Sequence, residues 1–433
     1  MQRLEKKNVD SSSLTIAVIG LGYTGLPLAM ALSAHFKVIG YDSNAARVQS
    51  LKNGIDQNGE TDLSRIHATA LHFTDQVNEM KSANIFIVAV PTPITAQQKP
   101  DLQPLAAAMQ LVGSLLKKGD CVVLESTVYP GCTEEFCVPI LEKTSGLKLQ
   151  HDFTVGYSPE RINPGDTVHQ LNSVVKLVAA SDQQTLALLS SMYEKVTNAG
   201  IYPCASIPIA EAAKLTENIQ RDVNIALMNE LSTVYQQMGI ETAAVWEAAA
   251  TKWNFLPFRP GLAGGHCISV DPYYLLEAAS KKDIPSPLVA LARQVNENMV
   301  AVVSKKVLSY LADQCVAGQP PSILIMGISF KADVSDIRNA KALQLAKSCA
   351  RAGVQVDIYD PIAAATTFEE TNVMRLTSQP QKKYELIVVA VGHRVFKELG
   401  EDYFCNISQS TAMVVDLTGY FRSIIKRRKY WSI

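Results

Sequence analysis

The sequence predicts an α/β protein in which two Rossmann-like, doubly wound domains are joined by a central all-helical domain with a long spine helix. Three observations support this prediction. Short β-rich runs alternate with helix-length stretches in the first and last parts of the chain, as is typical of doubly wound sheets. A glycine-rich turn follows the first of these runs. Residues 210–239, between the two α/β parts, favour helix and contain no internal breaker.

The first domain is predicted over residues 14–208, after a flexible N-terminal tail of residues 1–13. Leu14 to Ile19 form a short β-rich run. Pro27 falls in the first turn of the helix that follows, where the missing N–H of proline costs little. The other strands of this domain are expected at residues 37–42, 84–90, 121–127 and 153–159.

The central helical domain is predicted over residues 209–316. Its long helix suits either a spine between two domains or a dimer interface. Pro320 and Pro321 mark the boundary with the last domain, which is predicted over residues 317–433. The alternation of strands and helices returns there, with strands expected at 322–330, 354–361, 385–392 and 412–419.

The composition is that of an ordinary globular protein. The 433 residues are 47% hydrophobic and 19% charged, with a formal net charge of −1, so no basic excess points to nucleic acid. No apolar run approaches the roughly 18 residues of a membrane helix, and the N-terminus lacks the apolar core of a signal peptide. Eight cysteines without an export signal indicate reduced thiols. We therefore expect a cytoplasmic protein that binds neither nucleic acid nor membrane.

The turn after the first strand has the G-x-G-x-x-G spacing, formed by Gly20, Gly22 and Gly25. Such glycines permit a tight turn and let the backbone approach a pyrophosphate at the helix N-terminus. Asp42, at the end of the second strand, would bind the ribose hydroxyls and repel a 2′-phosphate, which favours NAD over NADP. Arg47 lies close by in the sequence and weakens that preference. A glycine turn without a cofactor is the structural alternative.

Lys214 and Asn218 are four residues apart on the long helix and therefore share one of its faces. A solvated face is one interpretation of such a pair. The alanines before Lys214 instead indicate a packed face, and a lysine with an asparagine is suited to hold an oxyanion and a water. The spacing alone does not decide between these interpretations.

The segment RPGLAGGHCISVDPYYL, residues 259–275, places Cys267 behind two glycines and four residues before Asp271. A helical turn that starts near Ile268 would stabilise a thiolate through its dipole, and the glycines would let backbone and ligand come close. Asp271 would then act as a base or position a water. The alternative is a buried cysteine with a helix-capping aspartate. His266 adjoins the cysteine, but two adjacent residues cannot easily chelate one ion, so no metal site is expected.

Other candidates lie at the ends of predicted strands, where open α/β sheets bind ligands. Thr127 and Glu160 occupy such positions in the first domain. Lys331 and Arg338 follow the first strand of the last domain and are suited to contact phosphates. A surface role for these two charges is the alternative.

Taken together, these stretches resemble the UDP-glucose/GDP-mannose dehydrogenase family over essentially the whole chain from Leu14 onward. The segments that carry the resemblance are GLGYTGLPLA, VPTP, ESTVYPG, SPERINPG, AEAAKLTENIQRDVNIA, PGLAGGHCISVDPYYL and FKADVSDIRN. Within the family, SPERINPGD and FRPGLAGGHCISVDPYYL are most similar to the UDP-N-acetylhexosamine 6-dehydrogenases of Vi-type capsule and O-antigen biosynthesis.

The resemblance implies an N-terminal NAD-binding domain, a central helical dimerisation domain and a C-terminal domain that binds the UDP-sugar. It also implies a four-electron oxidation without a metal, in which the C6 alcohol of a UDP-N-acetylhexosamine becomes a carboxylate while two NAD are reduced. UDP-N-acetylglucosamine is the expected substrate, and UDP-N-acetylgalactosamine or another UDP-sugar is the alternative. The expected assembly is a homodimer formed through the central helical domain.

The resemblance further implies roles for individual residues. Cys267 would attack the C6 aldehyde, giving a thiohemiacetal that loses a second hydride to become a thioester. Lys214 and Asn218 would stabilise negative charge on the C6 oxygen. Asp271 and Thr127 would organise a water, and Glu160 would assist proton transfer and thioester hydrolysis. The implied cofactor contacts are Gly20, Gly22, Tyr23, Thr24, Gly25, Asp42, Arg47, Pro91, Thr92, Thr127 and Arg338. The implied substrate contacts are Glu160, Arg161, Lys214, Asn218, Arg259, Gly264 and Lys331.

Two positions depart from the UDP-glucose enzymes of the family. Those enzymes carry a second glutamate where this chain has Pro164, and a lysine where it has Val270. Both differences agree with the acetamido-sugar branch, and they leave some family contacts without a counterpart. Two other functions compete. A single-step 3-hydroxyacid dehydrogenase would share the Lys-x-x-x-Asn pair but would not need Cys267, and a nucleotide-sugar or NAD sensor would need no catalytic residues.

Overall fold

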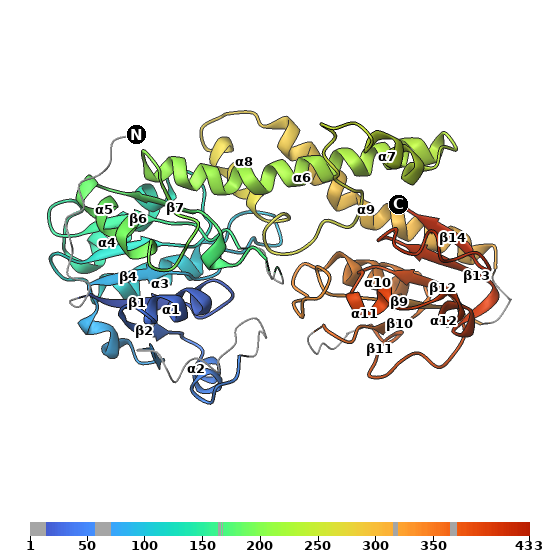
Figure 1. The fold of residues 1–433 in the computed structure, drawn as a ribbon, viewed down its shortest axis with the longest axis horizontal. Helices are drawn as coiled ribbons and strands as arrows, with labels where there is room; N and C mark the ends of the chain where they lie inside the picture. Colours follow the sequence, from blue (N-terminus) through green and yellow to red (C-terminus); the bar gives the residue numbers. More distant parts are fainter. Residues whose placement is uncertain (1–13, 57–70, 163–165, 167, 315–318, 364–369) are drawn as a thin grey trace. The chain divides into compact units, whose positions relative to one another are not determined.

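The structure is a computed structural model that describes residues 14–56, 71–162, 166, 168–314, 319–363 and 370–433. Pro164 and the predicted tail at residues 1–13 lie outside the described residues. The chain divides into two compact units (Figure 1), one of Met1–Glu217 with Tyr273–Pro285 and one of Asn218–Pro272 with Ser286–Ile433. The predicted limits of three domains stay a prediction.

The first unit is built on an eight-stranded sheet with the order β3-β2-β1-β4-β5-β6-β7-β8. Its first six strands pair in parallel, in the order of a doubly wound dinucleotide-binding sheet. The predicted Rossmann-like fold is therefore confirmed for this unit. The strands are β1 (Thr15–Ile19), β2 (Lys37–Tyr41), β3 (Leu71–Thr74), β4 (Ile85–Val88), β5 (Cys121–Leu124), β6 (Thr154–Tyr157), β7 (Lys176–Ala180) and β8 (Ile201–Pro203).

One pairing in this sheet departs from the parallel arrangement expected from the sequence. β7 runs antiparallel to β6, with Gly156 opposite Ala180 and Tyr157 opposite Ala179. Between these strands the described residues form only the short 3-10 helix Leu171–Ser173, whereas a parallel connection usually passes through a crossover α-helix. The five strands predicted from the sequence in this unit pair in parallel, and the antiparallel strand β7 was not predicted.

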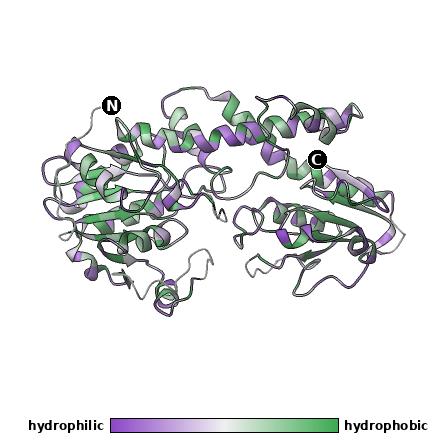
Figure 2. Cartoon of the chain, viewed as in Figure 1, coloured by the Kyte–Doolittle hydropathy of each residue, from purple (hydrophilic) through white to green (hydrophobic). Residues whose placement is uncertain are grey.

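Helices packed against the first sheet enclose its hydrophobic core. Ile16, Val18, Ile87 and Val123 on the central strands have 0% exposure, and Figure 2 shows these strands in the hydrophobic colour. The helices of this unit are α1 (Gly25–Ser33), α2 (Ala45–Lys52), α3 (Gln103–Gly113), α4 (Val138–Ser145) and α5 (Gln183–Tyr193), with a 3-10 helix at Val77–Ser82 and a π-helix at Thr133–Cys137.

The long helix predicted at residues 210–239 is α6 (Ile207–Gln237), and the division between the two units falls within it. It is followed by α7 (Thr242–Ala249), α8 (Asp271–Ser280) and α9 (Pro287–Ala312). Proline stands in the first turn of α9, where no intrahelical partner for its nitrogen is required. The predicted central helical region is therefore confirmed.

The second unit contains a six-stranded sheet with the order β11-β10-β9-β12-β13-β14, and all of its described strand pairs are parallel. Alternate residues of β9 face opposite sides, as strand geometry requires. Ile323 and Ile325 pack with α9 and α10, whereas Leu324 and Met326 pack with α11 and α12. The elements are β9 (Ser322–Met326), α10 (Lys341–Arg351), β10 (Gln355–Tyr359), β11 (Val373–Leu376), β12 (Tyr384–Val389), α11 (Arg394–Lys397), α12 (Glu401–Asn406), β13 (Ser408–Asp416) and β14 (Lys429–Ser432).

This sheet confirms the second predicted Rossmann-like domain. The sequence analysis missed five short strands, which are β3, β7 and β8 in the first unit and β11 and β14 in the second. Within the described part of the chain, no helix has both the length and the apolar character needed to cross a bilayer.

Candidate active site

The glycine turn of the first unit is packed too closely to accept side chains at two of its three glycines. Gly20 has a φ of +92°, and a Cβ on it would lie 2.8 Å from the carbonyl oxygen of Ala89. A Cβ on Gly25 would lie 1.8 Å from the carbonyl oxygen of Gly20, so α1 begins directly against the turn. No described atom lies within 4 Å of the Cβ position of Gly22, which leaves its backbone open to a ligand. This geometry fits a pyrophosphate at the N-terminus of α1.

Asp42 is held beside this turn by backbone donors. Its Oδ2 accepts the N–H of Leu21 at 2.9 Å, and its Oδ1 accepts the N–H of Asn44 at 2.9 Å. Arg47 donates from Nε and Nη2 to the carbonyl oxygen of Leu21, at 3.1 and 3.0 Å, and its Nη1 lies 2.7 Å from the carboxylate of Asp56. The guanidinium therefore supports the turn, and its proximity to Asp42 no longer weakens the preference for NAD.

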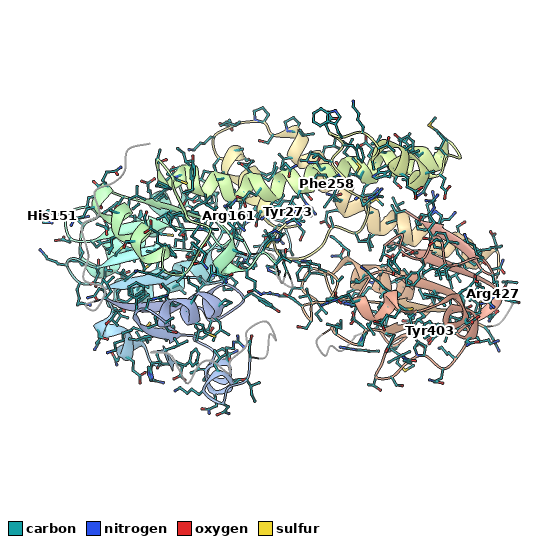
Figure 3. The ribbon with its side chains drawn as sticks, viewed as in Figure 1. His151, Arg161, Phe258, Tyr273, Tyr403 and Arg427 are labelled. Atoms are coloured by element: carbon teal, nitrogen blue, oxygen red, sulfur yellow. The ribbon has the colours of Figure 1, made fainter. Side chains whose placement is uncertain are left out.

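Thr127 and Glu160 follow β5 and β6, at the end of the sheet where ligands are expected. The Oε1 atom of Glu160 accepts the N–H groups of Arg161 and Ile162, at 2.6 and 2.7 Å. Arg161, labelled in Figure 3, forms an ion pair of 2.7 Å with Glu217 on α6. Of the other implied cofactor contacts in this unit, Tyr23, Thr24 and Thr92 are half-buried and Pro91 is exposed.

Lys214 and Asn218 lie on α6 with 7% and 6% exposure. The interpretation of this pair as a solvated face is therefore wrong. The Nδ2 of Asn218 donates to Oδ2 of Asp271 at 2.5 Å, and Asp271 is itself only 2% exposed. The structure thus brings together two of the predicted residues, Asn218 and Asp271, that are far apart in the sequence.

The two glycines before Cys267 are required by packing against residues 330–339. Gly265 has a φ of +92°, and a Cβ on it would lie 2.7 Å from Cδ2 of Phe330. A Cβ on Gly264 would lie 2.8 Å from the carbonyl oxygen of Asn339. The sequence analysis attributed these glycines to the close approach of a ligand. In the structure they let the cysteine loop pack against the segment that carries the predicted phosphate partners.

Asn229 holds the start of the cysteine loop and was not identified from the sequence. Its Oδ1 accepts the N–H of Gly261 at 2.8 Å, and its Nδ2 donates to the carbonyl oxygen of the same residue at 3.1 Å. Nδ2 also donates to Asn296 at 2.8 Å, and Asn296 donates to Asp222 at 2.8 Å. No local pattern reveals this clamp, because its members lie on two helices and a loop.

Cys267 differs in exposure from most of the other described cysteines. Cys267 and Cys405 are half-buried, whereas Cys121, Cys132, Cys137, Cys204 and Cys349 are buried. Burial raises the pKa of Cys121 to about 12 and that of Cys349 to about 11, so these two thiols stay protonated near neutral pH. Cys267 is therefore not a buried cysteine.

The helix after Cys267 begins later than the sequence predicted. α8 starts at Asp271 rather than near Ile268, and a turn precedes it in which the carbonyl oxygen of Cys267 accepts the N–H groups of Val270 and Asp271. His266 packs edge-on against Phe330. Among the described residues, no group of three or more His, Cys, Asp or Glu side chains could hold a metal ion.

A cavity of about 190 Å³ lies in the second unit, where the chain leaves β9 and β12. Lys331 and Lys341 line it together with Ser329 and Phe330. The charge of Lys331 fits a phosphate, whereas the ammonium of Lys341 is buried and paired with the carboxylate of Glu297. Arg338 does not line this cavity, and its guanidinium is bound by the carboxylate of Asp336, with Nε at 2.9 Å from Oδ2. The remaining implied substrate contacts, Arg259 and Gly264, are exposed and half-buried respectively.

Family models match three consecutive parts of the chain. They describe the NAD binding domain, at residues 14–197, the central domain, at 209–298, and the UDP binding domain, at 324–423, of the UDP-glucose/GDP-mannose dehydrogenase family. The chain belongs to this family. It is therefore an NAD-dependent oxidoreductase, and its glycine turn and its two-lysine cavity lie in the NAD-binding and UDP-binding parts of the family fold.

Curated relatives within the family agree over nearly the full chain. The UDP-N-acetyl-D-glucosamine 6-dehydrogenase of Salmonella typhi is 43% identical, over 93% of this chain and 95% of its own. The enzyme of the same name from Pseudomonas aeruginosa is 42% identical, over 93% and 96%. Protein CapL of Staphylococcus aureus is 41% identical, over 94% and 96%.

Solved structures of nucleotide-sugar dehydrogenases share the fold. UDP-D-ManNAc dehydrogenase from Pyrococcus horikoshii matches with a TM-score of 0.84 at 29% identity, over 97% of this chain and 99% of its own. The UDP-N-acetyl-mannosamine dehydrogenase Cap5O from Staphylococcus aureus matches with a TM-score of 0.82 at 25% identity, over 96% and 98%. Family membership sets aside both the 3-hydroxyacid dehydrogenase and the sensor.

Proposed function

We propose that this dehydrogenase oxidises the C6 hydroxyl of UDP-N-acetylglucosamine to a carboxylate, using two NAD, for the biosynthesis of a surface polysaccharide such as a capsule or O-antigen. The observation that carries the proposal is the half-buried Cys267 on a loop fixed by Asn229. A single oxidation of an alcohol needs no thiol, whereas a second oxidation at the same carbon requires the aldehyde to be retained.

The choice of sugar follows from the relatives. The relatives from Salmonella typhi and Pseudomonas aeruginosa, at 43% and 42% identity, are named for UDP-N-acetyl-D-glucosamine. A relative named for an N-acetyl-D-galactosaminuronic acid, from Ralstonia solanacearum, is 31% identical, as is a UDP-N-acetyl-D-mannosamine dehydrogenase from Pyrococcus horikoshii. UDP-N-acetylgalactosamine is therefore the second candidate.

In the first oxidation the chain supplies charge stabilisation and a path for the proton. NAD held at the glycine turn would supply the acceptor for the hydride of C6. Lys214 and Asn218 stabilise the negative charge that develops on the C6 oxygen as its proton leaves. Asp271, fixed by its 2.5 Å bond to Asn218, and Thr127 organise the water that takes this proton. The other residues that bind the substrate are Arg161, Arg259, Gly264 and Lys331. The cofactor site also includes Tyr23, Thr24, Pro91, Thr92 and Arg338.

In the second oxidation Cys267 binds the C6 carbon covalently. Its thiolate adds to the C6 aldehyde, which forms a C–S bond, and the oxygen takes up a proton to give a thiohemiacetal. Loss of a hydride from C6, for which the second NAD would be the acceptor, and of the hydroxyl proton to water gives a thioester. Water then adds to the thioester carbonyl with transfer of a proton to Glu160, and the C–S bond breaks as the thiolate leaves. The product is the uronic acid, and the enzyme is regenerated.

The first experiment is a substrate panel. The purified protein is incubated with NAD and single UDP-sugars, and NADH, free aldehyde and uronic acid are quantified. We expect the largest kcat/KM for UDP-N-acetylglucosamine and about two NADH per sugar without free aldehyde. One NADH per sugar with release of aldehyde would contradict the role of the thiol. A larger kcat/KM for UDP-N-acetylgalactosamine would mean that this UDP-sugar is the preferred substrate.

Substitution of the thiol tests the covalent step directly. In Cys267→Ser we expect uronic acid formation to fall by roughly 10³-fold or more, because the hydroxyl has no anionic form at neutral pH. Binding of the UDP-sugar and of NAD, measured by calorimetry, should be retained. Cys405→Ser is the matched control, since Cys405 is the other half-buried cysteine described. Near-normal turnover of Cys267→Ser would overturn the mechanism.

We further propose that the protein is a homodimer formed through its helical region. Leu227 and Val234 on α6 are 48% and 44% exposed and seven residues apart, so they share one helical face. Trp253, in the same unit, is 92% exposed. We expect light scattering to give the mass of a dimer, and Leu227→Glu with Val234→Glu to give a monomer. Met374→Glu, at another exposed apolar residue, should leave the dimer intact. We place the enzyme in the cytoplasm, where its free cysteines would stay reduced.

A further inference from the structure

A buried ionic cluster lies behind the predicted proton-transfer residue of the first unit. The Nζ of Lys176 lies 2.6 Å from Oε2 of Glu125, and the hydroxyl of Tyr193 donates to Oε1 of Glu125 at 2.6 Å. Their exposures are 3%, 1% and 0% in that order. A buried ion pair is weak support for stability, because desolvation offsets much of the attraction. The cluster therefore calls for a functional explanation.

The antiparallel direction of β7 explains why the lysine reaches this position. The paired residues Gly156 with Ala180 and Tyr157 with Ala179 set a register. Continued three residues beyond Tyr157, this register places Glu160 opposite Lys176, the first residue of β7. A parallel β7 would have put its first residue at the opposite end of β6. The departure from the parallel sheet thus delivers a positive charge to the ligand-binding end of β6.

Lys176 contacts the backbone that carries Glu160 as well as its side chain. Its Nζ donates to the carbonyl oxygens of Ser158 and Pro159, at 3.3 and 3.2 Å, and lies 3.8 Å from Oε2 of Glu160. Oε1 of Glu160 is bonded to two backbone N–H groups. Oε2 is buried and has no hydrogen-bond partner among the described residues. The ammonium is therefore the nearest described positive charge to the oxygen that is free to accept a proton.

The other charged and titratable groups around the cluster are few. Glu125, just after β5, and Tyr193, on α5, face the lysine, and Cys121 at the start of β5 interacts with Tyr193. The Arg161–Glu217 ion pair lies next to Glu160 along the chain. Burial raises the pKa of Glu125 to about 7, Lys176 lowers it and Glu160 raises it. One ammonium is thus shared by two carboxylates.

We propose that Lys176 is a positioning residue for the reaction: it orients Glu160 and places a positive charge beside its carboxylate, and Glu125 tunes this effect by neutralising part of the lysine charge. The inference rests on the proposed function in one respect, namely that Glu160 accepts a proton from the water that attacks the Cys267 thioester. In that step the C–O bond forms, the C–S bond breaks and the thiolate leaves, and the proton from water ends on Glu160. Neither Lys176 nor Glu125 touches the reacting atoms.

The pH dependence of uronic acid formation under single-turnover conditions tests this proposal, because the acidic limb reports ionisation of the base. In Lys176→Met, Glu160 loses a nearby positive charge, so the limb should move to higher pH by roughly one unit. In Glu125→Gln, the lysine charge is no longer neutralised, so the limb should move to lower pH. The double variant removes both charges, and its limb should return toward that of the wild type.

A purely structural role predicts a different pattern. It would lower the melting temperature of both single variants without moving the acidic limbs of their pH–rate profiles in opposite directions. That result would overturn the proposal. If Lys176→Met does not fold, the comparison of Glu125→Gln with the double variant carries the same test. Tyr193→Phe removes a hydrogen bond without changing charge and should leave the limb in place. Lys118→Met, which breaks an ion pair with Asp152 near the other end of β6, is the surface control.

Glu160→Gln separates a failure of this proposal from a failure of the proposed function. If Glu160→Gln hydrolyses the thioester normally, Glu160 is not the proton acceptor, and the proposed function and the positioning role fall together. If Glu160→Gln accumulates thioester while the limbs of Lys176→Met and Glu125→Gln match the wild type, the function stands and the positioning role is wrong. The expected result is accumulation of thioester in Glu160→Gln and opposite shifts in the other two variants.

Discussion

The two sheets of the molecule begin in the same way. In each, a central strand ends in a glycine of positive φ, Gly20 with +92° after β1 and Gly327 with +82° after β9. In each, an aspartate follows the neighbouring strand and accepts the N–H of the residue after that glycine. Asp42 bonds to Leu21 at 2.9 Å, and Asp360 bonds to Ile328 at 2.7 Å.

The two aspartates differ in their remaining bonds. Asp42 is half-buried and accepts one further bond, from a backbone N–H. Asp360 is 4% exposed and accepts backbone N–H groups at both oxygens, and Oδ2 lies 3.1 Å from Nε2 of the fully buried His393. Nδ1 of His393 accepts the N–H of Asp333 at 2.9 Å, so Nε2 carries the proton toward Asp360. Asp42 therefore keeps the capacity to accept hydrogen bonds from a ligand. The carboxylate of Asp360 is instead occupied by hydrogen bonds within the fold.

The chain after the glycine also differs. α1 starts five residues after Gly20, so its N-terminus stands at the turn. α10 starts at Lys341, and the loop between it and Gly327 carries Lys331 and Arg338. The same topology therefore places the backbone N–H groups of a helix N-terminus after the glycine in the first unit and a loop with basic side chains there in the second. Topology alone does not determine how each sheet recognises its ligand.

The largest effect is expected at Gly25. In Gly25→Ala the new Cβ would meet the carbonyl oxygen of Gly20 at 1.8 Å, and no side chain can move to relieve a contact with backbone. We expect α1 to shift, NAD binding to be lost and unfolding to become easier by about 3 kcal/mol or more. Calorimetry with NAD and thermal unfolding measure the two effects. Gly22→Ala is the control for packing and should keep the stability of the wild type, since nothing described lies within 4 Å of its Cβ.

The two aspartates should respond in opposite ways to the same substitution. Asp360→Asn leaves buried donors without an acceptor, so the free energy of unfolding should fall by about 2 kcal/mol, with the KM for NAD unchanged. Asp42→Asn should leave stability within experimental error and raise the KM for NAD by roughly tenfold, because a charged hydrogen bond to the ribose is lost. Chemical unfolding and steady-state kinetics on both variants check this. Equal effects of the two variants on KM would remove the distinction drawn between the sheets.

Low pH should reduce the free energy of unfolding through protonation of Asp360. Burial alone would raise its pKa, but the bonds from His393 and from the backbone N–H groups of Ile328 and Ala363 hold it at about 2. Because the folded pKa lies below the unfolded value of about 3.9, the stabilisation is complete above pH 4 and is lost as the pH falls toward 2. Its size is roughly 2 kcal/mol. The difference in unfolding free energy between the wild type and Asp360→Asn should therefore shrink between pH 4.5 and 2.5; a constant difference would contradict this pKa.

The comparison also shows which features could be read from the sequence. The buried strands β1, β4, β9 and β12 each contain a continuous apolar run, and the glycine turn has a fixed spacing. The local sequence pattern was therefore sufficient to predict these features. β7 was missed, and the burial of its first residue, Lys176, depends on contacts that no local pattern shows. Its antiparallel direction depends on a pairing that no local pattern specifies.

The candidate site residues show the same division between local patterns and distant contacts. Cys267, Asp271 and the Lys214–Asn218 pair were predicted as candidates because each lies in a short motif whose spacing has a chemical meaning. Asn229, Lys176 and His393 were not found, because each acts through contacts with residues far away in the chain. Their partners are buried polar groups, and the cost of leaving such groups unpaired is visible only once the fold has brought them together.

The smallest effect is expected at Arg47, and it tests whether Asp42 alone sets the choice of cofactor. Arg47→Lys keeps a positive charge near Asp56 but loses the two donors to the carbonyl oxygen of Leu21. Stability should fall by about 1 kcal/mol, because lysine lacks the planar fork of the guanidinium. The ratio of kcat/KM for NAD to that for NADP should stay within about threefold of the wild type, because a side chain bound to the turn contributes nothing to a 2′-phosphate. A selective loss of the residual NADP activity, by roughly tenfold, would instead mean that Arg47 leaves Leu21 and Asp56 to bind phosphate.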